Sequence, residues 1–102
     1  MKTIYIKTSA QGEAIKRAER LYLILRDCTP VIADIHWSRA EVQTENVFVR
    51  YISKNYILDG IRCDIAIGFN PLQTEIMTGK RERYDLYDEK QIAKFIVEEE
   101  SK

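Results

Sequence analysis

The hydrophobic residues of this chain recur with two different periods, and the period changes several times along its 102 residues. Alternation of apolar and polar residues indicates a half-buried strand, whereas a repeat of three to four indicates an amphipathic helix. The clearest alternation covers residues 61–69, where five apolar side chains share one face. A chain with both periods is expected to pack helices against a sheet, because each apolar face must be covered by another element.

The alternating pattern predicts strands over residues 3–7, 31–38, 47–52 and 61–69. Helical spacing predicts a long helix that starts near Thr8 and ends before Pro30, a short helix between Asn70 and Gly79, and a last helix that starts at Asp88. Residues 80–87 fit either a short edge strand or an ordered loop.

Capping signals support the three predicted helices. At the start of each helix, one residue has a side-chain oxygen that can accept a hydrogen bond from a backbone amide of the first turn. A glutamine follows three residues later, which is the spacing of a capping box. The pairs are Thr8 with Gln11, Asn70 with Gln73, and Asp88 with Gln91. Pro71 fits the first position of the short helix, and Gly79 fits its C-terminal end.

The order of elements is therefore β-α-β-β-β-α-(β)-α in one domain that covers residues 1–102. We expect an α+β fold with a single antiparallel-rich sheet of four to five strands and helices packed on one face. Short polar connections predict that the three middle strands form an antiparallel meander. If the first strand pairs parallel to one of them, the long helix is its crossover connection.

Charge and hydropathy exclude several classes of protein. Sixteen basic residues balance sixteen acidic ones, so no overall field attracts the chain to nucleic acid or to an anionic membrane. No apolar run approaches the ~20 residues that span a bilayer. The start of the chain, MKTIYIKTS, lacks the apolar run of a signal peptide. We therefore expect a cytoplasmic protein with no membrane partner.

Cofactor and metal motifs are not found in the sequence. Cys28 and Cys63 are far apart, and His36 is the only histidine available to join them in a zinc site. The four glycines are dispersed, which excludes a glycine-rich phosphate loop. We expect no cofactor and no bound metal.

Two weak catalytic hypotheses come from individual residues. His36 shares a predicted strand face with Asp34 and titrates near neutrality when unperturbed, as a general base does. Asp59 and Asp64 lie near the 61–69 strand and suggest a Mg²⁺-dependent nuclease. No lysine falls at the spacing such a nuclease uses, so we expect no catalytic residue and treat the nuclease as a minor alternative.

Two basic clusters suggest a second alternative, a nucleic-acid-binding module. Cations bind phosphates, and neighbouring aromatic rings stack on bases. The clusters are Lys16, Arg17 and Arg20 on the exposed side of the first helix, and Lys80, Arg81 and Arg83 beside two tyrosines. Glutamate and aspartate residues dilute both clusters, which favours a solvated surface.

The tyrosines support the preferred hypothesis. Tyr22 and Tyr51 fall on predicted core faces, but Tyr5, Tyr56, Tyr84 and Tyr87 have no obvious buried position. Tyrosine is enriched at interfaces because it buries a large ring and keeps one polar group. Edge strands offer a second route to association. We therefore expect a small, non-catalytic binding or regulatory protein with a protein–protein surface, acting on a protein partner or as a homodimer.

Overall fold

The computed structural model describes residues 1–28, 31–53, 61–80 and 88–102. Its elements are β1 (Lys2–Thr8), α1 (Gln11–Arg26), β2 (Asp34–His36), the 3-10 turn η1 (Trp37–Arg39), β3 (Glu41–Gln43), β4 (Val47–Ser53), β5 (Ile65–Ile67), α2 (Pro71–Thr78) and α3 (Glu89–Glu100). One sheet and three α-helices make up the described structure, which confirms the predicted α+β class. The 80–87 segment, which fitted a strand or a loop, lies outside the described residues from position 81 onward.

The sheet is mixed, with strand order β2-β3-β4-β1-β5. The β2–β3 and β3–β4 pairs are antiparallel, whereas β1 runs parallel to both β4 and β5. The parallel pairing of β1 with β4 makes α1 part of a crossover connection, as predicted. The predicted meander of three strands is wrong in its pairing. β2, β3 and β4 do form consecutive antiparallel pairs, but β3 lies between the predicted strands 31–38 and 47–52, and β5 pairs with β1.

β5 is also shorter than the nine-residue alternation predicts. The Cys63 amide donates to the Met77 carbonyl of α2 at 3.0 Å, so this part of the run is tied to a helix rather than to a strand. Asp64 accepts from the Thr3 amide at 2.7 Å. Gly68 then takes a φ of +83°, which ends the extended conformation. Periodicity identifies the buried face of a strand but not the strand beside it.

The predicted 31–38 strand divides into two structures. Only Asp34–His36 is β-strand, and the chain then turns through η1. Ala40 ends that turn with a φ of 51°, and its amide donates to the Trp37 carbonyl at 3.0 Å. The chain returns as β3, an additional short strand between the predicted strands 31–38 and 47–52. Trp37 therefore does not continue the buried face of Ala33 and Ile35.

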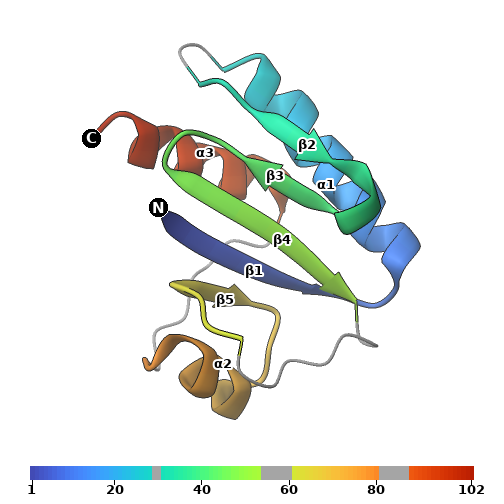
Figure 1. Ribbon diagram of the computed structural model, residues 1–102, viewed down its shortest axis with the longest axis vertical. Coiled ribbons are helices and arrows are strands. Elements are labelled where there is room, and N and C mark those ends of the chain that lie inside the picture. The colour runs from blue at the N-terminus through green and yellow to red at the C-terminus, as the bar shows by residue number, and fades with distance from the viewer. Residues whose placement is uncertain (29–30, 54–60, 81–87) are drawn as a thin grey trace.

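Helices α1 and α3 lie side by side on one face of the sheet, as predicted, and α2 lies beside β5 (Figure 1). The buried face of the sheet meets the apolar stripes of both helices, and this packing is the main source of stability. The core contains Ile4, Ile6, Ala14, Ala18, Leu21, Leu25, Val42, Val49, Tyr51, Ile65, Ile92 and Ile96.

Two of the three predicted helix caps are confirmed. Asn70 with Gln73 and Asp88 with Gln91 form complete capping boxes, and Gly79 ends α2 with a left-handed φ of 74°. The prediction for α1 is wrong. Its N-cap is Ala10, which offers no side-chain acceptor, and the Ser9 amide and hydroxyl instead donate to the Glu13 carboxylate.

Candidate functional site

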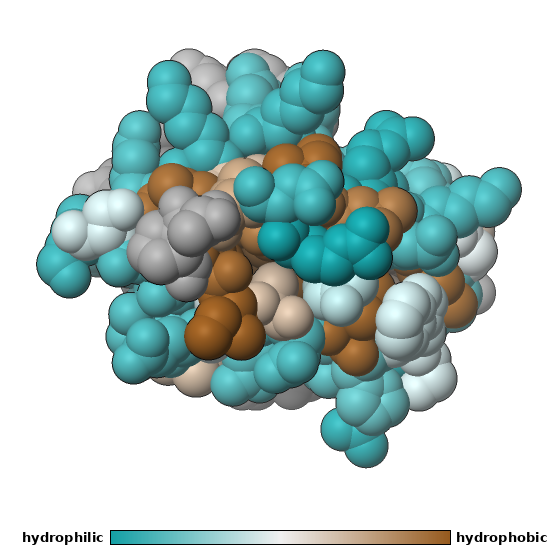
Figure 2. Space-filling model, turned by 90° about the horizontal axis from the view of Figure 1, so that it is seen from above, coloured by the Kyte–Doolittle hydropathy of each residue, from teal (hydrophilic) through white to brown (hydrophobic). Residues whose placement is uncertain are grey.

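The edge strand β2 lies between two large apolar side chains that the core does not use. Trp37, directly after the strand, is 51% exposed, and Ile32, two residues before it, is 80% exposed. Asp34 and His36 within the strand are exposed as well. We call these four residues the β2 surface. Figure 2 looks onto the end of the molecule that carries β2 and α1, where hydrophobic surface lies open between hydrophilic side chains.

Trp37 is held in place although half of its surface is exposed. Its ring meets the Tyr22 ring of α1 edge-on, with 6.1 Å between centroids and 66° between planes. The η1 turn that carries Trp37 is tied to the start of α1, because the Gln11 side chain donates to the Ser38 carbonyl at 3.3 Å. One side of the indole is therefore anchored, and the other is open to a partner.

A shallow hollow of about 500 Å³ adjoins β2 on the sheet face that points away from α1 and α3. Its polar rim includes Asp34, His36 and Glu41, and Phe48 supplies an apolar wall. His36 lies opposite Glu41 in the β2–β3 register, and its Nδ1 is 3.2 Å from the Ser38 hydroxyl. Glu41 also lies 3.6 Å from Arg50. Polar groups and an aromatic wall suit the rim of an interface.

A second apolar pair is exposed on α2. Leu72 is 67% exposed and Ile76 is 58% exposed, one helical turn apart. Residues four apart lie on the same face of a helix. Among the described residues nothing indicates what covers this pair, and it serves below as a control position.

The tyrosines predicted to bind a partner are only partly placed. Tyr5 is half-buried on β1, opposite Arg50 and Ala66, with two strands between it and β2. It therefore does not join Trp37. Tyr56, Tyr84 and Tyr87 lie outside the described residues. Their role in binding stays a prediction.

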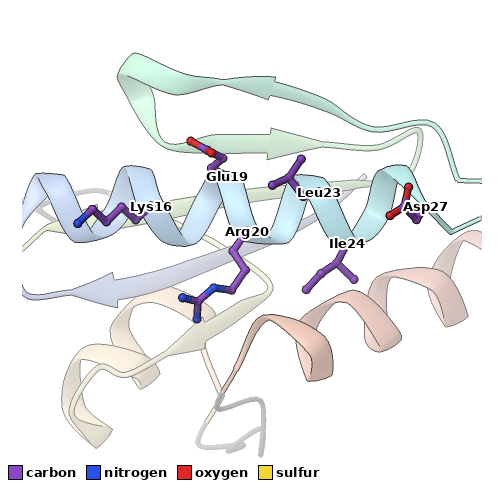
Figure 3. Close-up of a pocket in the computed structure, with 6 residues that line it drawn as sticks. All are labelled: Lys16, Glu19, Arg20, Leu23, Ile24 and Asp27. Carbon is purple, nitrogen blue, oxygen red and sulfur yellow. The ribbon is translucent and has the colours of Figure 1, made fainter.

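The first basic cluster stays together on α1. Lys16, Arg17 and Arg20 line one pocket of about 520 Å³, which they share with the acidic residues Glu13, Asp88 and Glu89. Lys16 and Arg20 also line an open pocket of about 470 Å³ beside Leu23 and Ile24. Figure 3 shows Arg20 and Ile24 on the side of α1 nearer α3, and Leu23 on the side nearer the β2–β3 hairpin. Lys80 is exposed, whereas Arg81 and Arg83 lie outside the described residues. The nucleic-acid hypothesis stays a prediction.

Arg17 differs from its neighbours, because it points inward instead of lying on the exposed side as predicted. Its Nη2 and Nε lie 2.8 and 3.1 Å from one oxygen of Glu89, a carboxylate that is almost fully buried at the start of α3. Arg20 lies 3.8 Å from the other oxygen. Burial alone would lower the pKa of Arg17, but the bonds to Glu89 outweigh it and the pKa is raised.

Tyr51 completes this cluster beneath the helices. The Arg17 guanidinium lies 5.2 Å from the centroid of its ring, a cation–π contact. Burial, and next the Glu89 carboxylate, raise the pKa of Tyr51, so its hydroxyl stays protonated. The hydroxyl is buried beside the Glu89 carboxylate but makes no hydrogen bond of good geometry within the described residues. The Arg17–Glu89 ion pair joins α1 to α3, and the contact between Arg17 and the Tyr51 ring joins α1 to β4, which suits a structural role.

Of the residues in the two catalytic hypotheses, Asp34 and His36 line the same hollow beside β2, whereas the nuclease pair is not brought together within the described residues. The Asp64 carboxylate accepts a hydrogen bond from the Thr3 amide, and Asp59 lies outside the described residues. Across residues 1–28, 31–53, 61–80 and 88–102, no three histidine, cysteine or acidic side chains are grouped as metal ligands would be. Cys28 and Cys63 are free thiols, and burial, with Asp64 next, raises the pKa of Cys63 to about 11.

Sequence reasoning missed three residues that matter here. Trp37 was placed in the predicted 31–38 strand rather than at a surface, and neither Ile32 nor Glu89 was singled out. A signal for Trp37 does exist: the polar pair Ser38-Arg39 follows it, so the alternation ends at this point. Glu89 gives no local signal, because its partner is 72 residues away.

In the described part of the chain, no helix is long and apolar enough to cross a membrane. No protein-family model, curated protein or solved structure matches the chain.

Proposed function

We propose that this chain is a small binding protein that acts through the β2 surface, with a second copy of itself as the partner. The observation that carries the proposal is Trp37, a half-exposed indole fixed by Tyr22 directly after an edge strand. Tryptophan is among the residues that contribute most to protein interfaces. Edge strands present backbone groups that another chain can pair with.

The energy available at Trp37 is large enough to matter. Covering the open half of an indole removes on the order of 100 Å² of apolar surface from water, which stabilises a complex by roughly 2–3 kcal/mol. Ile32 adds a second apolar contact on the other side of β2. Single exposed apolar residues are common on protein surfaces and do not indicate a binding site by themselves. Two that flank the same edge strand can be covered by one partner that binds along that strand.

Light scattering coupled to size-exclusion chromatography tests this proposal. The wild type is expected to run at twice the mass of one chain at high concentration and to dissociate on dilution. Trp37→Ala and Ile32→Lys should both shift the protein to the monomer, at least tenfold in dissociation constant, since about 1.4 kcal/mol corresponds to a factor of ten.

Leu72→Ala is the matched control, because it removes an equally exposed apolar side chain from α2. Ile32→Lys guards against a folding artefact, since Ile32 lies outside the core. A wild type that stays monomeric at every concentration contradicts the proposal. So does a dimer that Leu72→Ala disrupts and Trp37→Ala leaves intact.

A further inference from the structure

β2 has a free side in the described part of the chain. It stands at one end of the strand order and pairs there only with β3. The backbone groups on the outer side of an edge strand favour pairing with another strand. A second copy of the same chain offers the same edge, so two copies can pair only in an arrangement that is self-complementary.

We infer that two copies join β2 to β2 in antiparallel orientation about a twofold axis at Ile35, so that Asp34 of each copy lies opposite His36 of the other. This inference rests on the proposed function, and it adds the edge, the orientation and the register of the contact. The two sheets then form one continuous sheet, with α1 and α3 of both copies on the same side.

The register follows from the side chains of β2. Residues opposite one another in an antiparallel pair point to the same face of the sheet. The twofold axis must therefore pass through a residue, which leaves three choices within Asp34–His36. An axis at Asp34 places two aspartates opposite each other, and an axis at His36 places two histidines opposite each other. Only an axis at Ile35 pairs a carboxylate with an imidazole, twice.

The surroundings of His36 suit this pairing. Both Asp34 and His36 are exposed, so neither has to leave the core to meet a partner. Within its own chain His36 faces Glu41 and the Ser38 hydroxyl, and Glu41 is shared with Arg50. A carboxylate from the second copy would approach the imidazole from the open side. Opposite charges in facing positions stabilise a strand pair, and like charges destabilise it.

The same register also uses the apolar residues of the surface. It brings the end of β2 in one copy, where Trp37 begins the η1 turn, next to the start of β2 in the other copy. A strand of three residues supplies few backbone hydrogen bonds, so these side-chain contacts are needed for a stable dimer. The hollow beside Asp34 and His36 then meets its twin across the axis.

A charge-exchange experiment tests the register. The first variant is Asp34→Lys. The second is His36→Glu with Glu41→Gln, which avoids placing two carboxylates opposite each other within one chain. In its own dimer, Asp34→Lys sets two basic side chains opposite each other, and the second variant sets two carboxylates opposite each other. Each of these dimers should therefore be about tenfold weaker than that of the wild type. An equimolar mixture restores an acidic side chain opposite a basic one at both positions and should give mainly heterodimer by native mass spectrometry.

Glu98→Lys is the matched control, because it makes the same exchange of an acidic for a basic side chain at an exposed position on α3, away from β2. It should leave the dimer intact. A melting curve of each variant confirms folding. If the double variant does not fold, Asp34→Lys against Glu98→Lys still tests whether Asp34 lies in the contact, and an unchanged Asp34→Lys dimer overturns the register. A wild-type dimer whose charge variants pair at random overturns the register but leaves the proposed function standing. A wild type that never dimerises overturns both.

Discussion

At the last turn of α3, the Glu100 carboxylate is bound by the loop that joins β3 to β4. It accepts from the Asn46 amide and side chain, each at 2.8 Å, and from the Thr44 hydroxyl. Burial would raise its pKa, but the bonds from Thr44 and Asn46 outweigh burial and lower the pKa below 4.5. A single carboxylate thus ties the end of a helix to a hairpin.

This carboxylate makes the fold sensitive to acid in a defined direction. Because the folded-state pKa is lower than the unfolded value of 4.5, the stabilisation is complete above pH 4.5 and is lost as the pH falls through the folded-state value. Glu100→Gln should reduce the free energy of unfolding by about 1 kcal/mol at pH 7. Its deficit should shrink as the pH is lowered, in urea titrations at several pH values.

Glu98→Gln is the control for this prediction, since Glu98 is exposed two residues earlier on the same helix. It should change neither the stability nor the pH profile. If the two variants behave alike, the Glu100 contacts contribute nothing. Sequence alone did not predict these contacts: three consecutive glutamates oppose the helix dipole and suggest a frayed end, and the Asn46 partner is 54 residues away.

At the scale of elements, α1 and α3 are joined by a partly buried ion pair as well as by apolar packing. Glu89 is 2% exposed and has Arg17 as its close partner. Taking a carboxylate out of water is costly, so removing its partner leaves a charge that the fold cannot accommodate.

Arg17→Met should therefore destabilise the protein by roughly 2–4 kcal/mol, because Arg20 lies farther from Glu89 and is mostly exposed. The double variant Arg17→Met/Glu89→Leu should recover much of that loss, since two apolar side chains suit the same site. Urea unfolding of the wild type, both single variants and the double variant completes a mutant cycle. If the free energy of unfolding of the double variant falls by the sum of the two single effects, Arg17 and Glu89 do not act as a unit.

Elements with local signals were predicted well, and those set by distant contacts were not. The caps of α2 and α3 follow from Asn70 and Asp88, because a capping box involves residues only three apart. The partner of β5 was predicted wrongly, because alternation in 61–69 does not state which strand lies beside it. The extra strand β3 was missed, because a three-residue strand is shorter than any periodic signal can reveal.

For the whole molecule, helices on one face of one sheet followed from the pattern, but the binding surface did not. Tyr5 was predicted at an interface and lies two strands away from β2, while Trp37 was predicted only as part of the 31–38 strand and lies at the edge of the sheet. Whether an aromatic side chain faces the core or a partner depends on where its strand ends, and at β2 this is decided by the η1 turn.

Trp37 is the only tryptophan in the chain, so its fluorescence reports on the β2 surface alone. The emission of the wild type, measured across a dilution series, tests the central claim most directly. We predict that the emission maximum shifts to shorter wavelength as concentration rises, in step with the mass from light scattering, because the second copy covers the indole. An emission maximum that stays constant while the mass doubles would contradict the account.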